Sequence, residues 1–285
     1  MSNHELIVAL GERTYSVERP WNHLPPNFAF GRITDLALDT TGNVYVYQRF
    51  DSQVQDDIDP VSVFDPAGKL VTSWGKGRIV DAHGISVSYD NRVLLVDRDA
   101  HQILVFDKDG KPLLTLGERN TPNRPFNHPT DVAVAPNGDF YVSDGYGGSN
   151  VHWFDKTGSH RKTWGEPGSG PGQFTTPHGI WVTGDERVLV CDRENNRVQI
   201  FSLTGDYLSE WGDFFHPMDV YVDGEGLVYV TDQIPRVTML SLSGQRLGRC
   251  RPVLNGGHGM WGDKAGNLYF AEMNPNRVTR LRLHS

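Results

Sequence analysis

Three histidines occupy one recurring position of the chain, and each is followed by a glycine. The dipeptide occurs as His83-Gly84 in DAHGISVS, His178-Gly179 in TPHGIWVT and His258-Gly259 in GGHGMWGD. The matching dipeptides between them are Thr34-Asp35 in ITDLALD, Thr130-Asp131 in PTDVAVA and Met218-Asp219 in PMDVYVD, so these repeats have no histidine at this position and carry aspartate where the others carry glycine. Repeats with histidine therefore alternate with repeats with aspartate. If the repeats close into a ring, the three imidazoles point at one axis, which predicts a metal site.

Three neutral imidazoles with an open fourth position are a ligand set typical of catalytic zinc. Iron and copper also accept imidazole ligands, so the residues leave the metal open among these three. The glycine after each histidine removes a Cβ where the backbone approaches the crowded axis. A lone histidine would be interpreted as an ordinary structural residue, whereas three at equivalent positions indicate a shared metal.

The loops around this predicted metal carry three further polar residues. They are Arg49 in VYVYQRFD, Tyr146 in SDGYGG and Arg193 in CDREN, each just after the second strand of its repeat. An arginine there can pair with a carboxylate through two parallel hydrogen bonds. A tyrosine can transfer a proton, because a nearby cation makes a phenol more acidic. The competing interpretation of each is a solvated loop residue.

Six repeats must position these side chains. Each contains short runs of alternating apolar residues, rich in Val, Ile, Tyr and Phe and separated by Gly, Asn and Asp turns. Four short strands in a unit of about 40–50 residues are typical of a propeller blade. We therefore predict an all-β chain that forms a single six-bladed β-propeller over residues 1–285. The blades are expected at about 31–75, 81–117, 128–165, 176–212, 216–249 and 256–285.

The sixth repeat contains only three strands, and an open strand edge invites aggregation. The N-terminal segment RTYSVERP, residues 13–20, has strand character and is expected to close the ring as the missing outer strand. The preceding run ELIVAL is either a further strand or a simple arm. Residues 118–127 and 166–176 are rich in Pro, Gly and polar residues, which predicts loops at the histidine end of the ring.

Composition limits the function classes. The chain is 38% apolar and 22% charged, and no run approaches the ~18 apolar residues of a membrane span. Its net charge of −8 is spread without an acidic or basic block, which argues against nucleic acid and membrane surfaces as partners. Two cysteines cannot make a disulfide framework, and MSNHELIVAL lacks the pattern of a signal peptide. We expect a cytoplasmic protein with a small-molecule substrate. The sequence leaves its oligomeric state open.

The repeat pattern resembles NHL repeats. More narrowly, the chain resembles the peptidyl-α-hydroxyglycine α-amidating lyases, six-bladed propellers that split an α-hydroxylated glycine into an amide and glyoxylate. The resemblance runs from about Tyr15 to the C-terminus. It is most specific in PTDVAVAPNGDFYVSDGYGGSNV, WGEPGSGPGQFTTPHGI and DRENNRVQIF.

This resemblance implies a role for each residue named above. Zinc would be bound by His83, His178 and His258, the active-site tyrosine would be Tyr146, and the functional arginines would be Arg49 and Arg193. The secreted animal enzymes carry a cysteine directly after the tyrosine, whereas this chain has Gly147, in agreement with an intracellular protein. The family also holds a structural calcium, with an aspartate after the third histidine. Gly259 stands there, which argues against calcium, although Asp35, Asp131 and Asp219 could supply carboxylates near the axis.

The predicted function is therefore a zinc-dependent lyase that breaks the C–N bond of a carbinolamide or a related α-hydroxy compound. The substrate is expected to bear a carboxylate or an amide. The same residues also suit a metal-dependent hydratase or hydrolase. A non-catalytic NHL propeller that binds a protein or another ligand is the alternative from a different class, and it predicts an axis without metal. A gluconolactonase is disfavoured, since those propellers favour carboxylate and amide ligands.

Overall fold

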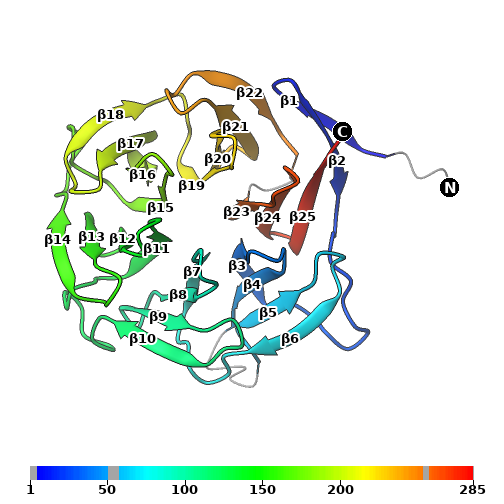
Figure 1. Cartoon of the computed structure of the whole chain (residues 1–285), viewed down its shortest axis with the longest axis horizontal. Coiled ribbons are helices and arrows are strands. Elements are labelled where there is room, and N and C mark those ends of the chain that lie inside the picture. The colour runs from blue at the N-terminus through cyan, green and yellow to red at the C-terminus, as the bar shows by residue number, and fades with distance from the viewer. Residues whose placement is uncertain (1–4, 51–57, 253–256, 285) are drawn as a thin grey trace.

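Six β-sheets surround a central axis in the computed structural model, which describes residues 5–50, 58–252 and 257–284 (Figure 1). The predicted six-bladed propeller of four-stranded antiparallel blades is confirmed. Residue 256, where the sixth blade was predicted to begin, lies outside the described residues. Within them no helix is long and apolar enough to cross a membrane.

The first three blades run in chain order from the innermost strand to the outermost one. Blade 1 consists of β3 (Arg32–Leu38), β4 (Val44–Arg49), β5 (Val61–Phe64) and β6 (Leu70–Trp74). Blade 2 consists of β7 (Ala82–Val87), β8 (Val93–Asp97), β9 (Gln102–Phe106) and β10 (Pro112–Leu116). Blade 3 consists of β11 (Pro129–Val134), β12 (Phe140–Asp144), β13 (Asn150–Phe154) and β14 (His160–Trp164).

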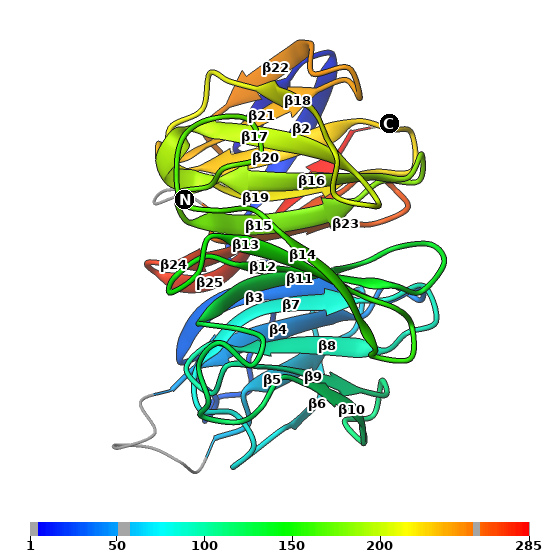
Figure 2. The same ribbon diagram turned by 90° about the vertical axis from the view of Figure 1, so that its left-hand side faces the viewer.

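Blades 4 and 5 repeat this order, and blade 4 lies above blade 3 in the side view of Figure 2. Blade 4 consists of β15 (Pro177–Val182), β16 (Arg187–Asp192), β17 (Arg197–Ser202) and β18 (Tyr207–Trp211), with the short 3-10 helix η1 (Arg193–Asn195) after β16. Blade 5 consists of β19 (Pro217–Val222), β20 (Val228–Asp232), β21 (Arg236–Leu240) and β22 (Arg246–Cys250).

The sixth sheet joins the two ends of the chain, as predicted. Its C-terminal strands are β23 (Gly259–Gly262), β24 (Leu268–Met273) and β25 (Asn276–Leu283). The N-terminal strand β2 (Arg13–Glu18) pairs antiparallel with β25, and β1 (Ile7–Leu10) adds a fifth strand outside β2. Figure 1 shows this N-terminal hairpin beside β22 of blade 5. The run ELIVAL thus contributes a strand.

Strand burial follows from the packing of blades face to face. The second strand of blades 2, 3 and 5 is buried along its whole length, because both of its faces meet a neighbouring blade. The outermost strand of blade 3, β14, is exposed except at its last residue, Trp164. One apolar cluster, for example, joins Leu94 and Val96 of blade 2 to Phe140 and Val142 of blade 3. The core is therefore a set of contacts between blades.

Candidate active site

The structure brings His83, His178 and His258 together at the axis. The centres of their rings lie 5.0–5.1 Å apart in all three pairs, and their ligand nitrogens lie within 4.8 Å of one another. His83 and His178 stand at the start of the inner strands β7 and β15, and His258 directly precedes β23. Three blades thus contribute one imidazole each to a nearly symmetric cluster.

Each imidazole is oriented by a backbone carbonyl of the following blade. The Nδ1 atoms of His83, His178 and His258 lie 2.6 Å from Thr130 O, 2.7 Å from Met218 O and 2.7 Å from Thr34 O respectively. A carbonyl oxygen can only accept, so Nδ1 must carry the proton in each ring. The Nε2 lone pair of each neutral imidazole is then available for a metal.

The aspartates of the alternate blades complete the ring of hydrogen bonds. Backbone N–H groups two residues after each histidine donate to the aspartate of the preceding blade: Ile85 N to Asp35 Oδ2 at 2.8 Å, Ile180 N to Asp131 Oδ2 at 2.9 Å and Met260 N to Asp219 Oδ2 at 2.7 Å. Together with the histidine bonds, six hydrogen bonds link all six blades around the axis. We call this set the axial ring.

A β-bulge lies at the histidine or aspartate position in the first five blades. The register between the first two strands shifts, for example, between Ala82 and Ile85 and between Pro177 and Ile180. A bulge bends the strand and changes the direction of a side chain. The glycines are required by the same geometry, because a Cβ on Gly84 would lie only 2.8 Å from Thr130 O. The dipeptide therefore serves both the bend and the close approach.

Burial keeps the three imidazoles neutral. Desolvation, together with the positive charges nearby, lowers the pKa of His258 to about 4 and those of His83 and His178 well below the usual histidine value. An imidazole with a lowered pKa is unprotonated at neutral pH, which is the form that binds a metal. The cluster therefore fits a divalent transition metal, and no described aspartate or glutamate joins it as a ligand.

Tyr146 points its phenol oxygen at this cluster. That oxygen lies 3.1 Å from Nε2 of His83 and 3.2 Å from Nε2 of His178, and Arg193 Nη1 donates to it at 3.2 Å. The loop that carries Tyr146 is held by Gly147 N, which donates to Asn127 O at 2.9 Å. A Cβ on Gly147 would lie 2.5 Å from Asn127 Oδ1, so this contact requires glycine. Gly147 is thus a packing residue of the site.

The two predicted arginines also lie beside the cluster. The guanidinium carbon of Arg193 lies 5.2 Å from the centre of the Tyr146 ring. Arg49 Nε donates to Ala82 O at 3.1 Å and is ion-paired with Asp81. Arg49 and Arg193 belong to blades 1 and 4 and come to one site only because the ring closes. All the predicted site residues therefore converge at one end of the axis.

Two residues of the site received no role from the sequence, Arg98 and Asp81. Arg98 is ion-paired with the buried Asp81 and lies over the Tyr146 ring at 5.4 Å. Burial raises the pKa of Asp81 to about 6, against the opposing effect of Arg49 and Arg98. A signal for Arg98 existed, since Asp97-Arg98 and Asp192-Arg193 occupy the same position after the second strand of their blades.

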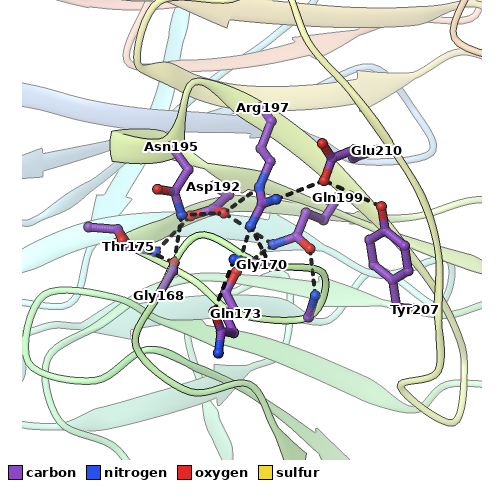
Figure 3. Close-up of polar contacts among 11 residues, drawn as sticks. Gly168, Gly170, Gln173, Thr175, Asp192, Asn195, Arg197, Gln199, Tyr207 and Glu210 are labelled. Carbon is purple, nitrogen blue, oxygen red and sulfur yellow. Dashed lines mark hydrogen bonds and ion pairs between the residues drawn. The ribbon is translucent and has the colours of Figure 1, made fainter.

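The loop of residues 166–176 forms part of the same end and is fixed by a buried polar network (Figure 3). Arg197 Nη2 donates to Gly170 O and Gln173 O at 2.8 and 2.9 Å, while its Nε is ion-paired with Asp192 at 2.8 Å. The loop is joined to η1, because Arg193 N donates to Thr176 O at 3.1 Å. This network positions the backbone on both sides of Arg193 and His178.

Aromatic side chains lie deeper on the axis, beyond the aspartates. The ring centres of Trp181 and Trp261 are 4.8 Å apart, and Tyr221 lies 5.1 Å from Trp181. Trp181 and Trp261 line a small cavity together with Asp35, Asp131 and Asp219. The histidines and Tyr146 stand on the other side of these carboxylates, so a ligand reaches them from the end of the ring that carries Arg49, Arg98 and Arg193.

Fold and geometry together define a six-bladed β-propeller with a three-imidazole cluster at one end of its axis. A family described as a 6-bladed beta-propeller matches residues 125–241. The peptidylglycine alpha-amidating monooxygenase of Rattus norvegicus is 30% identical over 89% of this chain and 30% of its own length. The peptidyl-alpha-hydroxyglycine alpha-amidating lyase 1 of Drosophila melanogaster is 32% identical over 70% of this chain and 42% of its own.

Human NHL repeat-containing protein 3 is 30% identical over 70% of this chain and 60% of its own length. The resemblance seen in the sequence is thus confirmed: the chain is a homologue of the amidating lyases and of NHL repeat proteins. It spans less than half the length of the rat and fly relatives. A gluconolactonase from Xanthomonas campestris has a TM-score of 0.72 at 14% identity, over 96% of this chain and 91% of the other, which shows the fold alone.

Proposed function

We propose that this protein is a zinc-dependent lyase that cleaves the C–N bond of a carbinolamide, with an amide and an α-oxo acid such as glyoxylate as products. The observation that carries the proposal is the convergence of the Tyr146 phenol oxygen with Nε2 of His83 and of His178, at 3.1 and 3.2 Å. A proton-transferring group and a set of metal ligands thus meet at one point, which is what this reaction requires.

His83, His178 and His258 would hold the zinc ion, because their Nε2 lone pairs face one another and their rings are neutral. When bound, the ion would act as a Lewis acid that makes a substrate hydroxyl group more acidic. The fixed Nδ1–H bonds to backbone carbonyls keep the rings from turning, so the ligand set is organised before a metal binds. Zinc is the metal that the resemblance to the amidating lyases implies, and three neutral imidazoles with an open fourth position are a ligand set typical of it.

Tyr146 moves the proton in this proposal. Its phenolate takes the proton of the substrate hydroxyl, the carbon–oxygen double bond forms, and the C–N bond breaks. The leaving nitrogen takes a proton from Tyr146, so no water is consumed and the atoms balance. Arg193 Nη1 donates to the phenol oxygen at 3.2 Å, which places a positive charge beside the atom that exchanges the proton.

The test combines metal analysis with a glyoxylate-release assay on N-benzoyl-α-hydroxyglycine, a simple carbinolamide. We expect about one zinc ion per chain and metal-dependent release of glyoxylate. Protein that contains no transition metal and cannot be reconstituted with zinc, cobalt or iron would contradict the proposal. Metal-containing protein that releases no glyoxylate from any carbinolamide would favour a hydratase or hydrolase at the same site.

A non-catalytic NHL propeller is the second candidate, favoured by the match to human NHL repeat-containing protein 3. That candidate does not require a tyrosine and two arginines from three different blades to converge on three imidazoles. It predicts that the His178→Ala variant keeps every function of the protein, whereas the lyase proposal predicts that this variant is inactive.

A further inference from the structure

A buried carboxylate holds two arginines from different blades side by side. One oxygen of Asp81 is ion-paired with Arg49 Nε and the other with Arg98 Nη2, and only 8% of the Asp81 side chain is exposed. Arg49 ends β4 of blade 1, whereas Arg98 follows β8 of blade 2. Arg98 N also donates to Asp81 O at 3.0 Å, so the loop that carries Arg98 is fixed to the same residue.

Both guanidinium groups border the proposed active site. Arg98 lies over the ring of Tyr146, with its guanidinium carbon 5.4 Å from the ring centre. Arg49 Nε donates to the carbonyl of Ala82, the neighbour of His83. The Tyr146 phenol oxygen lies 3.1 Å from Nε2 of His83, and Ala82 directly precedes His83, so both guanidinium groups lie beside the imidazole cluster.

The three arginines of the site differ in what they still offer to a ligand. Arg193 is engaged by the Tyr146 phenol oxygen and by Glu194. Among the described residues, the side-chain hydrogen bond of Arg49 comes from Nε, so its two Nη groups remain as a fork that matches a carboxylate. Arg98 uses Nη2 for Asp81 and Nε for Asp99, whose side chain is 44% exposed, and keeps Nη1.

We propose that Arg98, held beside Arg49 by Asp81, is a substrate-binding residue, and that the two guanidiniums together bind the carboxylate of the substrate. This inference rests on the proposed function and makes it more specific. It places the substrate carboxylate on the side of blades 1 and 2. Arg193, on blade 4, then serves only as the hydrogen-bond donor to Tyr146. The site then selects a carbinolamide whose α-carbon bears a carboxylate, and it discriminates against the uncharged amide analogue.

The experiment compares two inert ligands that differ only in this group, glycolate and glycolamide, by calorimetric titration of zinc-loaded protein. The variants are Arg98→Gln, which removes the charge, and Arg98→Lys, which keeps the charge without the planar fork. Arg92→Gln is the matched control, because Arg92 also lies over an aromatic ring, Phe140, at 5.2 Å and is ion-paired with an aspartate. Arg92 lies at the other end of the blade, in the turn before β8.

We expect Arg98→Gln to raise the Kd of glycolate about 10- to 100-fold, the usual effect of losing a hydrogen bond to a charged group. The Kd of glycolamide should stay within about twofold of the wild-type value. Arg98→Lys should fall between the wild type and Arg98→Gln, and Arg92→Gln should match the wild type. A purely structural role for Arg98 would change both ligands alike, so the ratio of the two Kd values is the decisive quantity.

The two proposals fail in different ways. An unchanged ratio in Arg98→Gln, in protein that releases glyoxylate from carbinolamides, would overturn the role of Arg98 and leave the lyase intact. If Arg98→Gln removes the preference for glycolate over glycolamide in a protein that cleaves no carbinolamide, the carboxylate-binding role of Arg98 is supported and the lyase proposal is contradicted. Wild-type protein that binds glycolate no better than glycolamide would overturn the inference as well.

Discussion

The phenol oxygen of Tyr146 and Nε2 of His178 lie 3.2 Å apart, yet replacing these side chains should have different consequences. Tyr146→Phe removes the proton-transferring group and leaves all three imidazoles in place. We expect the variant to keep its metal and its melting temperature while glyoxylate release falls roughly 10²–10⁴-fold, the range usual for a general acid or base. Full activity on every carbinolamide would show that Tyr146 transfers no proton.

His178→Ala should instead lose the metal, because two imidazoles bind zinc less tightly than three. The same change removes the hydrogen bond to Met218 O, and with it one of the links between blades 4 and 5. We expect less than one zinc per ten chains after dialysis, measured by atomic emission. His152→Ala is a useful control, since His152 is a buried histidine of blade 3 outside the cluster. A His178→Ala protein that holds zinc as tightly as this control would refute the assignment.

The sequence could predict the histidines, Tyr146 and the two arginines because repetition aligned them and a family motif surrounds three of them. It could not predict the shared role of Asp81. That residue precedes a histidine position in a single blade, and its two partners lie 32 and 17 residues away in different blades. The repeat pattern aligns equivalent positions of the blades, and it does not show which residues of neighbouring blades contact each other.

At the scale of an element, the N-terminal hairpin is fixed to two blades at once. Leu10 and Tyr15 are fully buried in a cluster with Tyr229 and Met239 of blade 5. Arg13 Nη1 donates to the phenol oxygen of Tyr229 at 2.6 Å and is ion-paired with Asp223 at 3.1 Å. The hairpin therefore closes the sixth sheet and also packs against blade 5.

This packing predicts a sharp difference between two glycines of blade 5. A Cβ on Gly248 would overlap the backbone of Gly11 in the hairpin, whereas a Cβ on Gly224 meets nothing within 4 Å. We expect Gly248→Ala to lower the free energy of unfolding by about 1–3 kcal/mol, as overpacking usually does. Gly224→Ala should stay within ~0.5 kcal/mol of the wild type. Equal denaturant midpoints for the two variants would show that the hairpin is not held as described.

The predictability of these elements follows from closure. β2 could be expected because the last repeat lacked a strand, and an unpaired edge must be covered. β1 could not be assigned, because β2 already completes the four strands of the sixth blade and the repeat pattern requires no fifth strand. Its position depends on contacts with blade 5, such as that of Gly11 with Gly248, which neither segment reveals alone.

At the scale of the whole molecule, three carboxylates from alternate blades are buried around one axis. Burial raises the pKa values of Asp35, Asp131 and Asp219, and mutual repulsion adds to the effect for the first two. In an unfolded chain the pKa of an aspartate carboxyl is about 4. The folded state therefore retains protons that the unfolded state loses above about pH 4, and the stabilisation that this ring supplies decreases as the pH rises towards neutral.

Asp219→Asn isolates this effect. The pKa of Asp219 is raised to about 7, so the wild type loses stability from this group between about pH 4 and pH 7, and an amide at this position does not titrate. We expect the melting temperature of the variant, relative to the wild type, to rise between pH 5 and pH 8 in metal-free protein. In the control Asp39→Asn, the replaced carboxyl has a lowered pKa, so the difference should stay constant over this range. A constant difference for Asp219→Asn would contradict the account.

The axial ring also limits the number of blades that such a propeller can have. Each histidine blade gives a hydrogen bond to the next blade through Nδ1, and each aspartate blade receives one from the next through its carboxylate. The two kinds of junction must alternate, so the circle closes only with an even number of blades. Gain or loss of a single blade would place two like junctions in succession and leave one hydrogen-bonding group unpaired at the axis. The repeating unit of the axial ring is accordingly a pair of blades, one with histidine and one with aspartate, and the six blades are three copies of that pair.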